Sequence, residues 1–360
     1  MNHHRVRVGL IAAVALLVQT ALAGPIAAQD STPAASPGAG ATVEQIAVVT
    51  PGSRTNQGWD QQAADAVDAV AAEAGIEGVV AENGGYEDIT PILRDLAAGG
   101  ADLIICHASG YQTVCPEFAA ESGVPVTVIE NAGAVTPGLV SDIETHAQDV
   151  AYLAGVLAGK VTQTGTVGVV VSGEPPTWNF MTVGFAEGLK ATKPDAKLLY
   201  SVIGEAAYDD AAGAKRVTEQ QLAADADVIF GMGDGASFGM VQAVEEHNAQ
   251  DGANKAWFID VIGDKRAEHG DVLLSSVLYD YTGIYKQMID DLEAGTFGNT
   301  YTMDVKNGAV RLLELPDEVS QEAKDAVATA EKSIVDGSVK VSVIGDAEEM
   351  KTKLAELFPQ

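Results

Sequence analysis

The side chains best suited to recognise a small molecule fall in six short segments, each directly after an apolar, β-branched run. They combine flat aromatic faces, amides and carboxylates, and those we expect to contact a ligand are Asn56, Trp59, Ser109, Gly110, Tyr111, Trp178, Phe180, Gly233, Asp234, Asp260 and Tyr279. Aromatic residues make up only 6% of the chain, so two of its three tryptophans in such segments are informative. Stacking faces beside hydrogen-bond acceptors suit a planar base or a sugar ring.

Each of these residues also has a purely structural interpretation. Trp59 and Trp178 could equally fill the gap between a loop and the helix that follows it. Asn56 could cap that helix, and Asp234 could stabilise a turn. Asp260 ends an apolar run and is the least well explained as a surface residue. As ligand contacts, Asp234 and Asp260 would accept hydrogen bonds from paired ribose hydroxyls.

Patterns typical of enzymes are weak in this chain. The stretch 231–236 fits the dinucleotide fingerprint G-x-G-x-x-A, but Asp234 within it would repel a pyrophosphate. The zinc motif H-E-x-x-H and the P-loop do not occur. The paired carboxylates Asp209 and Asp210 lack a pocket signature. We expect no cofactor, no metal and no catalysis, with a nucleoside or sugar hydrolase as the alternative from another class.

Short β-branched runs alternate with alanine-rich helical patterns, which predicts parallel sheets covered on both faces. Strands are expected at 45–50, 78–81, 102–106, 126–130, 167–171, 197–202, 227–231, 257–260 and 273–277. Helices are expected at 61–73, 89–98, 116–122, 147–160, 181–191, 213–224, 237–248 and 283–293. The tail adds segments at 308–315 and 317–336, a strand-like run at 339–344 and a final charged helix.

The pattern restarts after the apolar helix at 147–160. Strand, polar loop with a tryptophan, and helix follow one another near residue 45 and again near residue 167. This repetition predicts an α/β protein of two Rossmann-like lobes that the chain joins more than once. We expect the first lobe at 44–143 plus about 282–306 and the second at 144–281 plus about 307–360. Ligands of such sheets bind beyond the carboxyl ends of the strands.

The first residues predict export. A basic start and a short apolar run at 8–23 precede small residues, which is typical of a signal peptide at 1–28 cleaved near Ala28, or else near Ala23. A flexible Pro/Ala/Gly/Ser linker is expected at 29–43. The net charge of −30 disfavours polymeric nucleic acid, which binds basic surfaces.

The two cysteines, Cys106 and Cys115, permit a disulfide in an exported protein, although the sequence alone does not establish it. The histidines show no metal-ligand spacing. His107 and the others are therefore expected to be surface or loop residues.

Several stretches resemble the basic membrane protein family, the nucleoside-binding substrate-binding proteins of ABC importers. They are YLAGVLA at 152–158, the following VGVVVSGEPP, FMTVGFAEG at 180–188 and DADVIFGMGDG at 225–235. The resemblance runs from about residue 45 to 310. It implies a type I periplasmic-binding-protein fold with three hinge crossings and a purine nucleoside between the lobes.

The resemblance also implies roles for single residues. Asn56 stands where the family has a ligand-binding Asp, Trp59 matches its aromatic stacker, and Asp260 its ribose-binding Asp. The segment 109–111 matches the third-strand loop, and 233–234 the glycine-rich turn. Asn at 56, Tyr279 in place of lysine and the altered pattern FIDVIGD at 258–264 depart from the family.

Together these observations predict a monomeric, exported receptor that captures a small polar ligand, a purine nucleoside by resemblance, and delivers it to an ABC permease in the membrane. A sugar, a flavin or a signalling molecule is the alternative ligand for the same role.

Overall fold

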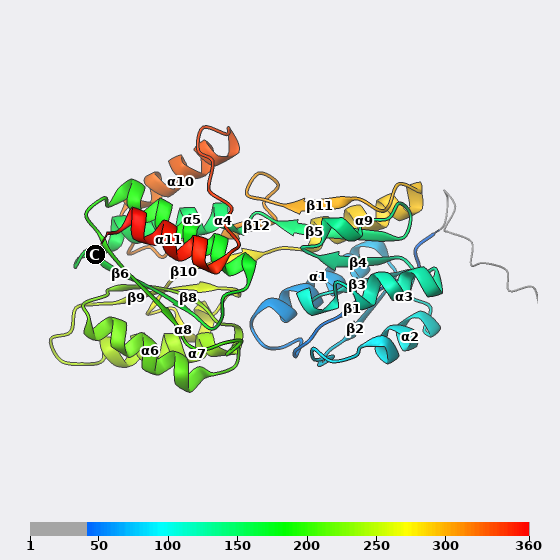
Figure 1. The fold of residues 1–360 in the computed structure, drawn as a ribbon, viewed down its shortest axis with the longest axis horizontal. Coiled ribbons are helices and arrows are strands. Elements are labelled where there is room, and N and C mark those ends of the chain that lie inside the picture. Colours follow the sequence, from blue (N-terminus) through cyan, green and yellow to red (C-terminus); the bar gives the residue numbers. More distant parts are fainter. Residues whose placement is uncertain (1–41, 360) are drawn as a thin grey trace, which may run out of the picture. The chain divides into compact units, whose positions relative to one another are not determined.

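The computed structural model describes residues 42–359, which form two six-stranded sheets covered by helices (Figure 1). The expected signal peptide and nearly all of the expected linker lie outside the described residues. The described part belongs to one compact unit. Within it, no helix combines the length and the apolar character needed to cross a bilayer.

The first sheet is entirely parallel. It has the order β11-β5-β4-β3-β1-β2, from the strands β1 (Gln45–Val49), β2 (Glu77–Ala81), β3 (Leu103–Cys106), β4 (Val126–Ile129), β5 (Val140–Thr145) and β11 (Thr300–Met303). All of β1 is buried, because helices cover both faces. Helices α1 (Trp59–Ala74) and α9 (Thr282–Ala294) pack on one face, and α2 (Thr90–Ala98) and α3 (Val114–Ser122) on the other. We call this sheet with its helices the first lobe.

The second sheet repeats the arrangement with one antiparallel edge strand. Its order is β12-β10-β9-β8-β6-β7, from β6 (Thr166–Val171), β7 (Lys197–Val202), β8 (Val228–Met232), β9 (Trp257–Val261), β10 (Leu273–Tyr279) and β12 (Val310–Leu312). Helices α4 (Ala147–Val161) and α5 (Pro176–Thr192) lie on one face, with α10 (Gln321–Val335) against α4 and α11 (Ala347–Leu357) against α5. Helices α6 (Ala211–Ala223) and α7 (Ser237–Asn248) cover the other face. This is the second lobe.

Helices α4 and α5 approach each other unusually closely. A Cβ added to Gly155 would lie 2.0 Å from the Phe185 carbonyl oxygen, and one added to Gly188 would lie 2.0 Å from that of Tyr152. Glycine is therefore required at both positions because the two backbones are in contact. The motif-like stretches around residues 152–158 and 180–188 thus build a helix pair rather than a binding surface.

The chain passes between the two sheets three times. It leaves β5 for α4 at His146, leaves β10 for α9 at residues 280–281, and leaves β11 for β12 at residues 304–309. The crossings are bonded to one another: the His146 N–H donates to the Met303 carbonyl over 2.8 Å, and the Asp280 N–H to that of Ala309 over 2.7 Å. The predicted fold class of two joined α/β lobes is confirmed.

Three details differ from the sequence-based expectation. Strands β5 and β11 were not predicted, because their sequences, VSDIET and TYTM, are half polar. The strand predicted at 339–344 is wrong. That segment lies along α5 instead of pairing with a strand, since the Glu187 carboxylate accepts hydrogen bonds from the Ser342 N–H and hydroxyl.

Candidate functional site

The loops that follow the strands of the two lobes contact one another directly. The Trp59 indole N–H donates to the Tyr281 hydroxyl over 2.7 Å, and Lys265 Nζ donates to the Gln57 carbonyl over 3.1 Å. The Tyr279 N–H donates to the Gln62 side-chain carbonyl over 2.9 Å. Because parallel strands present their carboxyl ends at one edge, these contacts bring the expected ligand-binding edges of both sheets together.

Asn56 organises the start of α1. Its Oδ1 accepts hydrogen bonds from the N–H groups of Gly58 and Gln61, which helix geometry would leave without partners. Its Nδ2 donates to Asp60 Oδ2 over 2.8 Å. Asn56 therefore fixes the orientation of the Asp60 carboxylate on the first turn of the helix.

Asp60 is 7% exposed and carries an unused acceptor. Its Oδ1 has no hydrogen-bond partner among the described residues. Burial raises the pKa of Asp60 to about 6, although hydrogen bonds from Gly52 and Asn56 oppose the shift, and the charge of Asp209 adds to it. A buried acceptor without a donor is costly, and Asp142 Oδ2 in the first sheet is in the same position.

Asp234 lies in the second lobe, and the charge of Asp60 acts on it. It begins a short 3-10 helix (Asp234–Ala236) after β8, with φ of 43°. Burial, then the charge of Asp60, and more weakly the charges of Asp209 and Asp260, raise the pKa of Asp234 to about 7, whereas Lys265 lowers it. Gly235 packs on the exposed Asp209 carboxylate, since a Cβ added there would lie 2.5 Å from Oδ1. Carboxylates of both lobes thus share one electrostatic environment.

Two tyrosines that were not predicted complete this environment. Tyr86 follows β2 and is 60% exposed, and Tyr208 follows β7. Partial burial and the negative charges of Asp234 and Asp60 raise the pKa of the Tyr86 hydroxyl, and its neighbours include Tyr208. Partial burial and Asp234 also raise the pKa of Tyr208. We call Asp60, Asp209, Asp234, Tyr86 and Tyr208 the acidic site.

The segment Ser109–Tyr111 forms a 3-10 helix beside the acidic site. Ser109 and Gly110 are exposed, and Gly110 lies against the Tyr86 ring, whereas Tyr111 is buried and donates to the Gly85 carbonyl over 2.5 Å. Tyr111 therefore supports the loop that holds Tyr86. Cys106 and Cys115 are joined in a disulfide that encloses the segment.

Asp260 is fully buried and already paired. Its Oδ2 accepts from Lys265 Nζ over 2.5 Å, and its Oδ1 accepts from the Val261 N–H. Lys265 is 2% exposed, and it also donates to the carbonyls of Ile262 and Gln57. The pair therefore neutralises Asp260 and anchors a loop of the first lobe. A ligand contact of Asp260 stays a prediction.

Most of the other predicted site residues serve packing. Phe180 and Tyr279 belong to the apolar core, and the Tyr279 hydroxyl lies 3.5 Å from Met181 Sδ. Trp178 is half-buried, with its ring edge-on to Tyr208 at 5.4 Å. Of the set, those that lie in or beside the acidic site are Asn56, Ser109, Gly110, Trp178, Gly233 and Asp234.

His107 lies in the loop after β3, which is one of the two expected alternatives, but it is not a surface residue. It is fully buried, its Nε2 lies 3.2 Å from the Trp59 carbonyl, and its ring centroid lies 4.0 Å from that of Trp59. Burial lowers the pKa of His107 to about 3, so the ring is neutral. The His107 ring packs against the Tyr281 ring as well, with the two ring centroids 5.2 Å apart.

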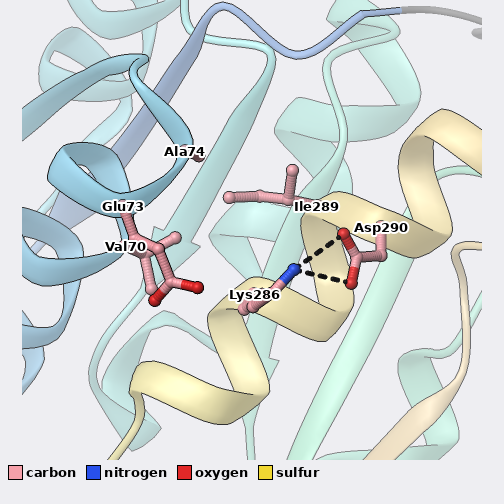
Figure 2. A pocket seen from close by; sticks show the side chains of 6 residues that line it. All are labelled: Val70, Glu73, Ala74, Lys286, Ile289 and Asp290. Carbon is pink, nitrogen blue, oxygen red and sulfur yellow. Dashed lines mark hydrogen bonds and ion pairs between the residues drawn. The ribbon is translucent and has the colours of Figure 1, made fainter.

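Two hollows in the described part of the first lobe lie away from the acidic site. One, of about 90 Å³, lies between α1 and α9, lined by Val70, Glu73, Ala74, Lys286, Ile289 and Asp290. Figure 2 shows Lys286 paired with Asp290 on its own helix. The second, of about 190 Å³, lies at the amino ends of the strands, beside Val43 and Pro125. Neither brings residues of both lobes together.

Comparisons with known proteins agree with this architecture. A family model described as "ABC transporter substrate-binding protein PnrA-like" matches residues 43–344. The chain is 29% identical over 227 residues to the ABC transporter nucleoside-binding protein BmpA of Lactococcus lactis, and the match covers 60% of this chain and 62% of that protein. The chain thus spans about three fifths of the length of that relative.

Two solved structures have the same fold. The solute-binding protein of an ABC transporter system from Aeropyrum pernix aligns with a TM-score of 0.74 at 19% identity, covering 88% of this chain and 99% of that one. The corresponding protein from Conexibacter woesei aligns with a TM-score of 0.71 at 20% identity, covering 84% and 99%. At these identities the similarity establishes the two-lobed fold.

Proposed function

Because the chain belongs to the PnrA-like family of ABC transporter substrate-binding proteins, we propose that it is an exported receptor that binds a nucleoside at the acidic site, between its lobes, and delivers it to a membrane permease. The family consists of binding proteins rather than enzymes. The relative from L. lactis is named for nucleoside binding, which supports this class of ligand.

The observation that carries the proposal is the contact between the loops at the carboxyl ends of both sheets, where Lys265 bonds to Gln57 and Trp59 to Tyr281, near carboxylates whose charges interact. Tyr86 offers an exposed aromatic face in the first lobe, and Tyr208 and Trp178 offer rings in the second. Asp60 and Asp234 supply acceptors for ring N–H groups or ribose hydroxyls. A ligand in contact with both sets would hold the lobes together, which is how a two-lobed receptor signals occupancy to its partner.

Binding should be measured by isothermal titration calorimetry with adenosine, guanosine and inosine, after native mass spectrometry of the purified protein for carried-over ligand. Replacing Tyr86 by Ala should weaken nucleoside binding about tenfold, as expected for loss of one base-stacking face. Val343→Ala removes another exposed apolar side chain outside the site and should leave affinity unchanged.

Three results would refute the proposal. Turnover of a nucleoside by the protein would identify a hydrolase. A melting-temperature shift with glucose or ribose and none with nucleosides would assign a sugar. Equal affinity of the Tyr86→Ala variant and the unmodified protein would place the ligand elsewhere.

A further inference from the structure

The loop after β1 and the first turn of α1 make hydrogen bonds to the second lobe. The Gln57 carbonyl accepts from Lys265 Nζ over 3.1 Å, and the Gln62 side-chain carbonyl accepts from the Tyr279 N–H over 2.9 Å. Nearer the surface, Gln57 Nε2 donates to Glu268 Oε1 over 3.3 Å. Both partners of each bond belong to the protein, so its own hydrogen bonds favour contact between the lobes.

The ammonium group of Lys265 completes its hydrogen bonding only when the lobes touch. An ammonium group has three N–H donors. Within the second lobe, Lys265 donates to Asp260 Oδ2 over 2.5 Å and to the Ile262 carbonyl over 2.9 Å. The third acceptor is the Gln57 carbonyl of the first lobe, and the lysine side chain is 2% exposed. Separation of the lobes therefore breaks a charge-assisted hydrogen bond, which is stronger than one between neutral groups.

The backbones of the two lobes are in contact beside this bond. A Cβ added to Gly263 would lie 2.0 Å from the Gln57 carbonyl oxygen, so only glycine fits there. Gln57 has a φ of 54°, a left-handed conformation that is unfavourable for a residue with a side chain. Its N–H donates to Gln61 Oε1 over 3.0 Å and its carbonyl accepts from Lys265, so these two bonds hold the conformation. We call Gln57, Gly263 and Lys265 the interlobe latch.

We propose that the interlobe latch determines ligand affinity by setting the fraction of the receptor in which the two lobes are in contact. A ligand that needs both lobes binds only to this fraction, and its apparent affinity falls in proportion as the fraction falls. The three latch residues contact one another, so they act as positioning residues. The inference rests on the proposed function, because it takes the ligand to bind between the lobes.

A matched pair of glycine substitutions tests the latch. Gly263→Ala adds a methyl group that displaces the Gln57 carbonyl. Gly100→Ala is the control: Gly100 has a φ of 102°, against 105° for Gly263, but it has open space around it and lies in the turn between α2 and β3. Both changes place alanine in the same unfavourable backbone region, so only Gly263→Ala acts on the contact between the lobes.

Both variants and the unmodified protein are unfolded and refolded to remove carried-over ligand. Small-angle X-ray scattering without added nucleoside should then show a larger radius of gyration for Gly263→Ala than for the other two proteins. Calorimetric titration with adenosine, guanosine and inosine should show about tenfold weaker affinity for Gly263→Ala, as expected if the competent fraction falls from most of the molecules to about a tenth. Saturating nucleoside should restore the radius of gyration, because the ligand then adds its own contacts to both lobes. A local packing defect would not respond to ligand in this way.

Gln62→Leu removes the acceptor of the Tyr279 N–H without backbone strain, and it covers the case in which Gly263→Ala does not fold. It should change the radius of gyration and the affinity in the same direction. Equal radii of gyration and equal affinities for Gly263→Ala and Gly100→Ala would overturn the latch and leave the nucleoside assignment standing. A loss of affinity with an unchanged radius of gyration would also overturn it. A larger radius of gyration for Gly263→Ala, in a protein that binds no nucleoside, would support closure by the latch and overturn the nucleoside assignment.

Discussion

Replacing Asp234 by Asn should stabilise the ligand-free protein at neutral and alkaline pH. Burial and the charge of Asp60 raise the pKa of Asp234 from 3.8 to about 7. The folded state thus holds its proton more tightly than the unfolded chain. Stability from this group is complete below pH 3.8 and is lost as the pH rises toward 7, because the folded protein must then accept the charge. Asn keeps the shape of the side chain and never acquires that charge.

The magnitude follows from the size of the shift. About three pKa units at about 1.4 kcal/mol each give an upper limit of about 4 kcal/mol at pH 8. Asp234 is partly exposed, so solvent screens part of this effect and we expect about 1–3 kcal/mol. For a protein of this size, that gain corresponds to a rise in melting temperature of roughly 2–6 °C.

Thermal unfolding should be followed by circular dichroism or calorimetry between pH 4 and pH 8. The variant should melt above the unmodified protein at pH 8, and the two should converge near pH 4. Asp264→Asn is the matched control: hydrogen bonds from Arg266 lower the pKa of Asp264, so this change should cost a little stability at pH 8. A destabilised Asp234→Asn variant at pH 8, or a gain that does not depend on pH, would refute the reasoning.

Two further changes test features of the scaffold. Lys265→Met leaves the charge of Asp260 buried and unpaired, so urea denaturation at pH 7 should show a loss of about 3–5 kcal/mol in the free energy of unfolding. Adding Asp260→Asn to this variant should restore stability. A Lys265→Met variant as stable as the original protein would show that Asp260 is neutral. Gly188→Ala places a methyl group 2.0 Å from the Tyr152 carbonyl oxygen and should lower the free energy of unfolding by about 1–3 kcal/mol or more. Gly283→Ala, in a helix with open space around it, should leave the free energy of unfolding unchanged or raise it. Similar effects of the two changes would contradict the close packing of α4 and α5.

The sequence was sufficient to predict the fold class because the strands and helices have strong, alternating apolar patterns. It failed for β5, where Ser141 and Asp142 are polar and yet fully buried. Both side chains accept hydrogen bonds from backbone N–H groups of neighbouring loops, of Gly298 and Asn131 respectively. Such long-range bonds leave no periodic pattern in the sequence.

The candidate site was predictable only in part. Asn56 and Asp234 were found because they follow fully buried, apolar strands. Tyr86 and Tyr208 follow β2 and β7, the outer strands of their sheets, which are partly exposed and give a weaker apolar signal. Both tyrosines lie a few residues after the second strand of their lobe, and this repetition was the signal that could have revealed them. The pairing of Asp260 with Lys265 depends on the way that the loop at 262–265 turns back, which residue spacing does not reveal.

The three crossings also constrain the order in which the molecule folds. The first lobe receives α9 and β11 only after all of β6 to β10 has been synthesised, so the second lobe is nested within the first along the chain. Until those elements arrive, α1 lacks its neighbour and the outer edge of β5 has no partner strand. Contacts over such sequence separations slow folding. A chain that folds while it is being made therefore completes its first lobe only once most of the second has been synthesised, and a chaperone that protects β5 in the interval would raise the yield of folded protein.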